Sequence, residues 1–370
     1  MARSPSAMLR ARVPASLAGA LDVPVGQVRE RRGAGGVADL VVSAAGKTFA
    51  IELLGGAPAG RVAAHAERVA RAARKLGASV VPVVAVPFMT DAGRKACQAA
   101  GVSWFDLSGN AHIVAPGLRV IVDGRPNQYR PRGRPSSVFA PKSARVVRWL
   151  LLRPQQAFTQ REIARSTGMS DGFVSRIVTR LEADGFVDRV ADGHGAGDVD
   201  GSGRGDGTRR GRAPVRVRDA AVLLDAWRDE YEFAKHTILR GHVAARSGDA
   251  LTRLVGERLT ARKVEHAATG LSAAWQLSRF AAFRIATFFV ATEPSAALLK
   301  EIGFREEPRG ANLWIVVPND AGVFLGADDH DGVRCVHPVQ AYLDLAEHPE
   351  RAAEAAERLR SEFMRWKTRG

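Results

Sequence analysis

The sequence predicts a multidomain protein of mixed α/β class, in which a small, mainly helical unit separates two α/β units. Strand and helix patterns alternate over residues 38–124, helical periodicity dominates residues 142–190, and mixed patterns return after residue 219. A chain of 370 residues is long enough for three domains that each bury a core.

Two stretches without apolar periodicity set the expected boundaries. One is rich in proline and arginine and includes RPNQYRPRGRPSS, and the other is rich in glycine and is expected to be disordered. The expected segments are an N-terminal extension (1–37), an α/β domain (38–124), a basic Pro/Arg linker (125–141), the helical unit (142–218) with its Gly-rich insert (191–214), and a C-terminal α/β domain (219–370).

The charge of the chain favours a polyanionic partner. The formal net charge is +15, and residues 125–218 hold nineteen Lys and Arg against nine Asp and Glu, so the excess is concentrated around the helical unit. Cys97 and Cys335 have no disulfide or metal-ligand spacing, and no apolar run is long enough to span a membrane. We expect a cytoplasmic, nucleoid-associated protein with neither metal nor cofactor.

The N-terminal unit carries two carboxylates in neighbouring strand patterns, Asp39 and Glu52. This resembles the PD-(D/E)XK, or restriction-endonuclease-like, arrangement, in which two carboxylates hold Mg²⁺ and a nearby lysine activates water. The position of that lysine is occupied by Leu54, which cannot polarise water. We therefore expect the domain to serve binding or dimerisation rather than catalysis, and a metal-dependent DNA nuclease or repair factor remains the alternative.

The central unit has the order of a winged helix-turn-helix. A first helix presents Val146, Val147, Leu150 and Leu151 on one face, and a second helix begins after Thr159 with a capping box to Glu162 and ends at Gly168. A third helix, 170–183, buries Val174, Ile177, Val178 and Leu181, and wing strands are expected at 186–190 and 215–217.

The exposed face of the third helix predicts contact with double-stranded DNA. Hydroxyl and guanidinium groups there can reach base edges and phosphates in a major groove. A winged helix that binds protein instead is the alternative. The expected contact residues of the helices and wing are Thr159, Gln160, Arg161, Ser170, Gly172, Ser175, Arg176, Thr179, Arg180 and Arg189.

Two basic segments flank this unit. Arg130, Arg132 and Arg134 form an AT-hook-like Arg-Gly-Arg core that can lie in a narrow minor groove, although a solvated Pro/Arg linker has the same composition. In the Gly-rich insert, Arg209, Arg210 and Arg212 are expected to contact phosphates.

The C-terminal unit is expected to begin with a long helix, 223–239, to hold strands at 284–290 and 312–317, and to end in the helix 349–366. Its Thr269-Gly270-Leu271-Ser272 turn precedes a strand, as in minimal nucleotidyltransferases, but that strand lacks the required carboxylates. We expect a degenerate nucleotidyltransferase-like fold without transfer activity.

Two further stretches, GVSWFDLSGNA at 101–111 and HPVQAYLDL at 337–345, resemble the bacterial AbiEi-like transcriptional regulators, the antitoxins of type IV toxin–antitoxin systems. The resemblance implies that the winged helix represses a promoter and that the C-terminal domain supports regulation of a toxin encoded nearby. The expected partners are therefore double-stranded DNA, a second copy of the chain in a homodimer, and a toxin, with no membrane. A C-terminal platform for another nearby protein is a further alternative.

Overall fold

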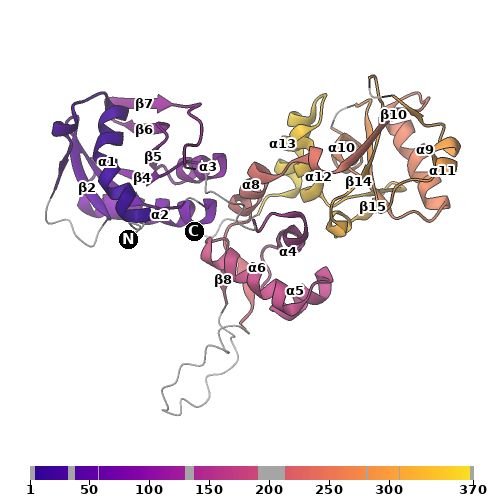
Figure 1. The fold of residues 1–370 in the computed structure, drawn as a ribbon, viewed down its shortest axis with the longest axis horizontal. Helices are drawn as coiled ribbons and strands as arrows, with labels where there is room; N and C mark the ends of the chain where they lie inside the picture. Colours follow the sequence, from indigo (N-terminus) through magenta and orange to yellow (C-terminus); the bar gives the residue numbers. More distant parts are fainter. Residues whose placement is uncertain are drawn as a thin grey trace, which may run out of the picture. The chain divides into compact units, whose positions relative to one another are not determined.

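The computed structural model describes residues 5–31, 38–56, 58–129, 137–190, 213–280, 282–307 and 309–366. The chain is of mixed α/β class (Figure 1), and it forms two compact units, Met1–Ser136 with Leu181–Asp188 and Ser137–Arg180 with Arg189–Gly370. None of the helices in these described ranges is both long and apolar enough to cross a membrane.

The N-terminal domain is built on one sheet whose strands follow chain order, β1-β2-β3-β4-β5-β6-β7. The pairs β3–β4 and β4–β5 are parallel, and the other neighbours are antiparallel. The strands are β1 Arg29–Glu30, β2 Leu40–Ala44, β3 Lys47–Leu53, β4 Val80–Val86, β5 Ser103–Asp106, β6 Ala111–Ala115 and β7 Leu118–Val122.

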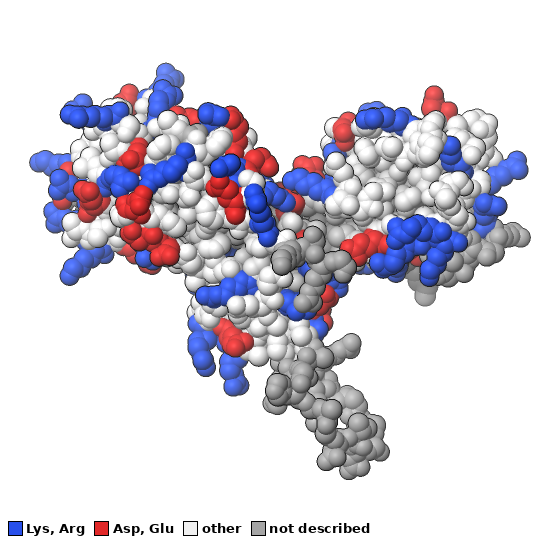
Figure 2. Space-filling model, turned by 180° about the vertical axis from the view of Figure 1, so that it is seen from behind, with Lys and Arg blue, Asp and Glu red and all other residues white. Residues whose placement is uncertain are grey.

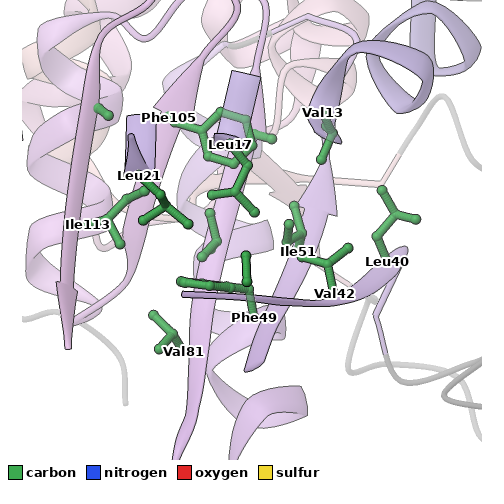
Figure 3. Packing of buried hydrophobic residues seen from close by; sticks show 14 of the residues in the cluster. Val13, Leu17, Leu21, Leu40, Val42, Phe49, Ile51, Val81, Phe105 and Ile113 are labelled. Carbon is green, nitrogen blue, oxygen red and sulfur yellow. The ribbon is translucent and has the colours of Figure 1, made fainter. Parts of the chain in front are cut away.

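Helix α1, Pro5–Leu21, covers one face of this sheet. Its apolar residues Leu9, Val13, Leu17 and Leu21 are buried in one cluster with strand residues that include Phe49, Ile51 and Phe105 (Figure 3). The sequence had suggested a separate N-terminal extension over residues 1–37, but α1 supplies part of the core. Pro14 inside the helix and its many alanines weaken the pattern that would have revealed it.

Helix α2, Ala59–Leu76, covers the opposite face, and α3, Asp91–Ala99, packs against α2. Because side chains alternate along a strand, Ala50 and Leu54 face α2 whereas Phe49 and Ile51 face α1. Glu52 belongs to the α2 side by the same alternation, which places its carboxylate next to the polar side chains of that helix.

The winged-helix region is formed by three helices and a two-stranded sheet. The elements are α4 Pro141–Leu152, α5 Gln160–Thr167, α6 Asp171–Ala183, β8 Val187–Arg189 and β9 Val215–Val217. The apolar residues expected on the inner face of the first helix are all buried, as are Val174, Val178 and Leu181 of α6. Ile177 is only half-buried.

The C-terminal domain contains a second sheet in the order β13-β10-β14-β12-β11-β16-β15. Its strands are β10 Thr237–His242, β11 His266–Ala268, β12 Ala286–Val290, β13 Arg305–Glu306, β14 Leu313–Val317, β15 Asp328–His330 and β16 Val333–Cys335. Its helices are α8 Ala220–Glu230, α9 Gly248–Ala261, α10 Gly270–Ser278, α11 Ala296–Glu301, α12 Pro338–Asp344 and α13 Ala352–Phe363.

Both faces of this sheet are covered around β12. Phe288 lies on the side of α9, close to Gly256, whereas Thr287 and Phe289 contact His348 and Phe233 on the other side. All five residues of β12 are consequently buried.

The long helix expected over 223–239 is wrong in its second half. Helix α8 ends at Glu230, and Thr237–His242 is strand β10, which pairs with β13 and β14. Short apolar segments fit a helix or a strand equally well, and here pairing in the sheet decides the outcome.

Candidate nucleic-acid interface

The second helix of the winged-helix region is fixed at both ends by local hydrogen bonds. The Thr159 N–H donates to Glu162 Oε2 at 2.7 Å, and the Glu162 N–H donates to Thr159 Oγ1 at 3.2 Å, which completes the capping box. Gly168 ends the helix with φ of +66°, a left-handed conformation that favours glycine. The sequence prediction for α5 is confirmed at both ends.

Helix α6 separates an apolar side from a polar side. Val174, Val178 and Leu181 are fully buried. The candidate DNA-contact residues occupy the remaining surface: Ser170, Gly172, Arg176, Thr179 and Arg180 are exposed, and Ser175 is half-buried. The side chains of Ser175, Arg176, Thr179 and Arg180 are therefore held on one helix.

Two cations lie over the ring of Phe173 at the start of α6. The guanidinium carbon of Arg176 is 5.8 Å from the ring centroid, and the Lys142 ammonium of α4 is 5.5 Å from it. Such contacts hold a long basic side chain in place without neutralising its charge. The positive charges of Lys142 and Arg176 therefore lie close to the half-buried Phe173, beside the exposed face of α6.

The wing is joined to the helices by backbone hydrogen bonds. Phe158, before α5, exchanges two of them with Val215 of β9, at 2.9 and 2.8 Å between N and O. On the β8 side, Arg189 donates from Nη1 to the carbonyl oxygen of Ala213 at 3.4 Å. This hydrogen bond ties the half-buried Arg189 to the base of the wing.

At the start of α5, Gln160 is half-buried and Arg161 is exposed. The other predicted DNA contacts lie outside the described residues. They are Arg130, Arg132 and Arg134 of the linker and Arg209, Arg210 and Arg212 of the Gly-rich insert. Among the described parts, Figure 2 shows Lys and Arg side chains projecting from the winged-helix region, with fewer acidic ones between them.

A buried arginine links the winged-helix region to the C-terminal domain, and sequence reasoning missed it. Arg148 of α4 is 3% exposed, and its guanidinium carbon lies 5.0 Å from the ring centroid of Trp227 in α8. It donates from Nε (3.0 Å) and Nη2 (2.5 Å) to Gln340 Oε1 of α12, whereas Nη1 has no partner. Burial lowers the pKa of Arg148 to about 10.

The same polar network continues to Asp344 at the end of α12. Its carboxyl group accepts hydrogen bonds from Tyr231, Thr269 and Gln340. Burial raises the pKa of Asp344 to about 7, although these hydrogen bonds and Arg148 oppose the shift. The network is thus a polar core shared by the winged-helix region and the C-terminal domain.

The candidate carboxylates of the N-terminal domain have protein partners. Glu52 is 1% exposed, its Oε2 lies 3.0 Å from His65 Nδ1, and Arg68 also donates to it. Burial raises the pKa of Glu52, but these hydrogen bonds outweigh burial, so the net shift is downward. Asp39 Oδ2 accepts from the Leu53 N–H at 2.8 Å.

This arrangement does not resemble a ready metal centre. In the described parts of the chain, no three His, Cys, Asp or Glu side chains are grouped to hold a metal ion. Leu54 is fully buried beside α2, and the cation nearest to Glu52 is Arg68 of that helix.

The Gly-Ser turn of the C-terminal domain is part of the core. Thr269 and Ser272 are fully buried, and Ser272 Oγ accepts from the Thr287 N–H at 3.0 Å. Gly270 has φ of +56° and lies against His348. These contacts use the polar groups of the turn to join α10 to β12.

Comparison with known proteins gives two matches. Residues 140–196 match the model of the MarR family, and residues 216–365 match a model described as a transcriptional regulator, the AbiEi antitoxin of a type IV toxin–antitoxin system. The second match includes the stretch 337–345 but not the stretch 101–111. The predicted resemblance is confirmed, while no curated protein and no solved structure matches the chain.

Proposed function

We propose that this chain, a DNA-binding regulator with a MarR-type winged helix and an AbiEi antitoxin-type C-terminal region, represses its own promoter by placing α6 in the DNA major groove. The observation that carries this proposal is the division of α6 into a buried apolar side and an exposed side of hydroxyl and guanidinium groups. The AbiEi match, described as a transcriptional regulator, favours regulation over catalysis.

Within this proposal, the contacts divide by type. Ser175, Arg176, Thr179 and Arg180 reach base edges or phosphates in the groove, because they lie on successive turns of the exposed side of α6. The start of α5 and the wing contact the sugar-phosphate backbone, which sets the register of α6. The residues assigned to these supporting contacts are Thr159, Gln160, Arg161, Ser170, Gly172 and Arg189.

The basic segments add sequence-tolerant binding. Arg130, Arg132 and Arg134 enter a neighbouring minor groove, and Arg209, Arg210 and Arg212 neutralise phosphates beside the wing. Both roles rest on composition and on the position of these segments next to the winged-helix region in the sequence.

The outer domains support regulation in this proposal. The N-terminal domain is a restriction-endonuclease-like fold that mediates homodimerisation, and the pairing of Glu52 with Arg68 together with Leu54 in place of a lysine argues against cleavage. The C-terminal domain is a degenerate nucleotidyltransferase-like fold that meets a toxin encoded nearby, which the AbiEi match supports. A dimer would present two α6 helices to half-sites one helical turn apart.

Substitution of Arg176 tests the DNA-reading role. Arg176→Ala removes an exposed guanidinium from α6, and we expect it to cost about 1–3 kcal/mol of binding free energy at the specific site and to reduce the salt dependence. Fluorescence anisotropy with DNA from upstream of the gene, at several salt concentrations, measures both quantities.

The matched control is Arg258→Ala, which removes the same charge from helix α9 of the C-terminal domain and should leave affinity unchanged. If Arg176→Ala and the unmodified protein bound the DNA with equal affinity across the salt series, Arg176 would not contact the DNA.

A further inference from the structure

A cavity of 590 Å³ opens in the C-terminal domain between β10, β14 and the start of α9. Its volume is within the range of small-molecule binding sites in proteins. None of its lining residues belongs to the set proposed to read DNA. The cavity therefore has no role in the function proposed above.

The titratable side chains that line this cavity are all basic. They are Arg240 and His242 of β10, Arg246 before α9, and Arg284 before β12. Glu350 pairs with Arg284, from Oε1 to Nε at 3.3 Å, but no carboxylate of the described residues pairs with Arg240 or Arg246. Two guanidinium groups are thus available to a ligand, and guanidinium groups suit phosphate oxygens because they donate two parallel hydrogen bonds.

The start of α9, where the first backbone N–H groups have no acceptor within the helix, lies at the same cavity. Ser247 and Gly248 both line it, and Ser247 Oγ accepts the N–H of Ala250. A β-carbon at Gly248 would lie 2.3 Å from the carbonyl oxygen of Phe283. Only glycine therefore allows the first turn of this 14-residue helix to approach the backbone at Phe283. The positive end of the helix dipole then favours an anion beside the arginines.

The rest of the lining is apolar or aromatic. Phe283, Ile285, Ala245 and Ala311 contribute apolar surface, and the ring of Trp314 carries the Arg240 guanidinium 5.0 Å from its centroid. An inorganic ion would leave this apolar surface and most of the volume unused. A ligand that fits both the basic and the apolar lining has an anionic group, here called the head, and an organic part, here called the body.

We propose that this cavity binds a small organic phosphate, with its phosphate oxygens held by Arg240, Arg246 and the start of α9 and its body against Trp314, Phe283 and Ile285. The site goes beyond DNA reading by α6 and does not depend on it.

Calorimetric titration of the full chain tests the site with three probes. ADP carries head and body, inorganic pyrophosphate carries the head alone, and adenosine carries the body alone. We expect saturable binding of ADP, weaker saturable binding of pyrophosphate, and weak or no binding of adenosine. The double variant Arg240→Gln/Arg246→Gln should raise the Kd for ADP by about tenfold or more, because two charge-assisted contacts are lost.

The matched control, Arg258→Gln/Arg262→Gln, removes two positive charges near the other end of α9 and should keep the Kd unchanged. Ala245→Trp fills the cavity without changing its charge and should weaken ADP more than pyrophosphate. Thermal unfolding monitored by circular dichroism identifies any variant that fails to fold.

Three results would overturn the proposal. One is the absence of saturable binding of both ADP and pyrophosphate at millimolar concentration. Another is equal ADP affinity of the Arg240/Arg246 variant and the unmodified protein, which places the anion elsewhere. The third is a loss of DNA affinity in that variant without ADP binding by the unmodified protein, which would assign the cavity to nucleic acid.

Discussion

At the scale of single residues, burial shifts the pKa values of Arg148 and Asp344, and the sequence around these residues does not predict that they are buried. Arg148 follows Val147 on α4, and nothing local distinguishes it from a surface arginine. Its hydrogen-bond partner Gln340 lies 192 positions further along the chain. The exposed arginines of α6 were predictable because helical spacing alone places them opposite the apolar stripe.

We expect Asp344 to make the free energy of unfolding depend on pH. Burial raises its pKa to about 7 in the folded protein, well above the ordinary value of about 4 for an aspartate. Its protonated form therefore stabilises the fold at low pH, and this contribution is lost as the pH rises from about 4 through 7. Asp344→Asn should flatten this part of the curve of unfolding free energy against pH, measured by chemical denaturation.

The comparison isolates Asp344 because the two proteins share their other titrating groups. Burial lowers the pKa of both His236 and His337 to about 4, so their contributions change with pH in the opposite direction but cancel in the difference. Parallel curves for variant and unmodified protein between pH 4 and pH 7 would show that titration of Asp344 does not contribute to stability.

At the scale of elements, local sequence signals predicted where helix α5 begins and ends. They did not predict contacts between segments that are far apart in the sequence. The capping box at Thr159 and the left-handed Gly168 fix α5 where the sequence placed it. Strand β10 escaped prediction because its hydrogen-bond partners, β13 and β14, come more than sixty residues later. Helix α1 escaped because its apolar residues gain their burial only from the distant sheet.

The capping box gives a prediction at this scale. Thr159→Ala removes the side chain that accepts from the Glu162 N–H, and we expect the free energy of unfolding to fall by about 1 kcal/mol. Thr159→Ser keeps the hydroxyl and should stay close to the unmodified protein. Urea denaturation followed by circular dichroism measures both, and an equal loss in the two variants would show that the hydroxyl is not responsible.

At the scale of the molecule, residues 137–180 of the winged-helix region share a compact unit with the C-terminal domain. Arg145 Nε lies 2.6 Å from Asp320 Oδ1, and Gly322 allows this approach, since a β-carbon there would lie 2.5 Å from Arg145. The sequence predicted these parts as separate domains, because contacts between domains leave no periodic signal.

Arg148 is a buried charge that contacts Gln340 and Trp227 of the C-terminal domain, so its removal should destabilise the winged-helix region and the C-terminal domain together. We expect Arg148→Ala to lower the free energy of unfolding by about 3 kcal/mol, because it leaves the Gln340 oxygen unpaired and opens a space beside Trp227. Denaturation monitored by tryptophan fluorescence and by circular dichroism should show coincident shifts. Arg153→Ala, whose guanidinium lies over Trp149 at an exposed position, is the control and should cost less than about 1 kcal/mol.

We propose above that α6 reads DNA in a major groove. Hydroxyl-radical and methylation-protection footprinting of the full chain on DNA from upstream of its gene tests it most directly. We expect a bounded site with protected guanine N7 positions in the major groove, and we expect this protection to be lost in Ser175→Ala/Arg176→Ala. Protection that is uniform along the DNA, or a site that survives this double substitution unchanged, would contradict it.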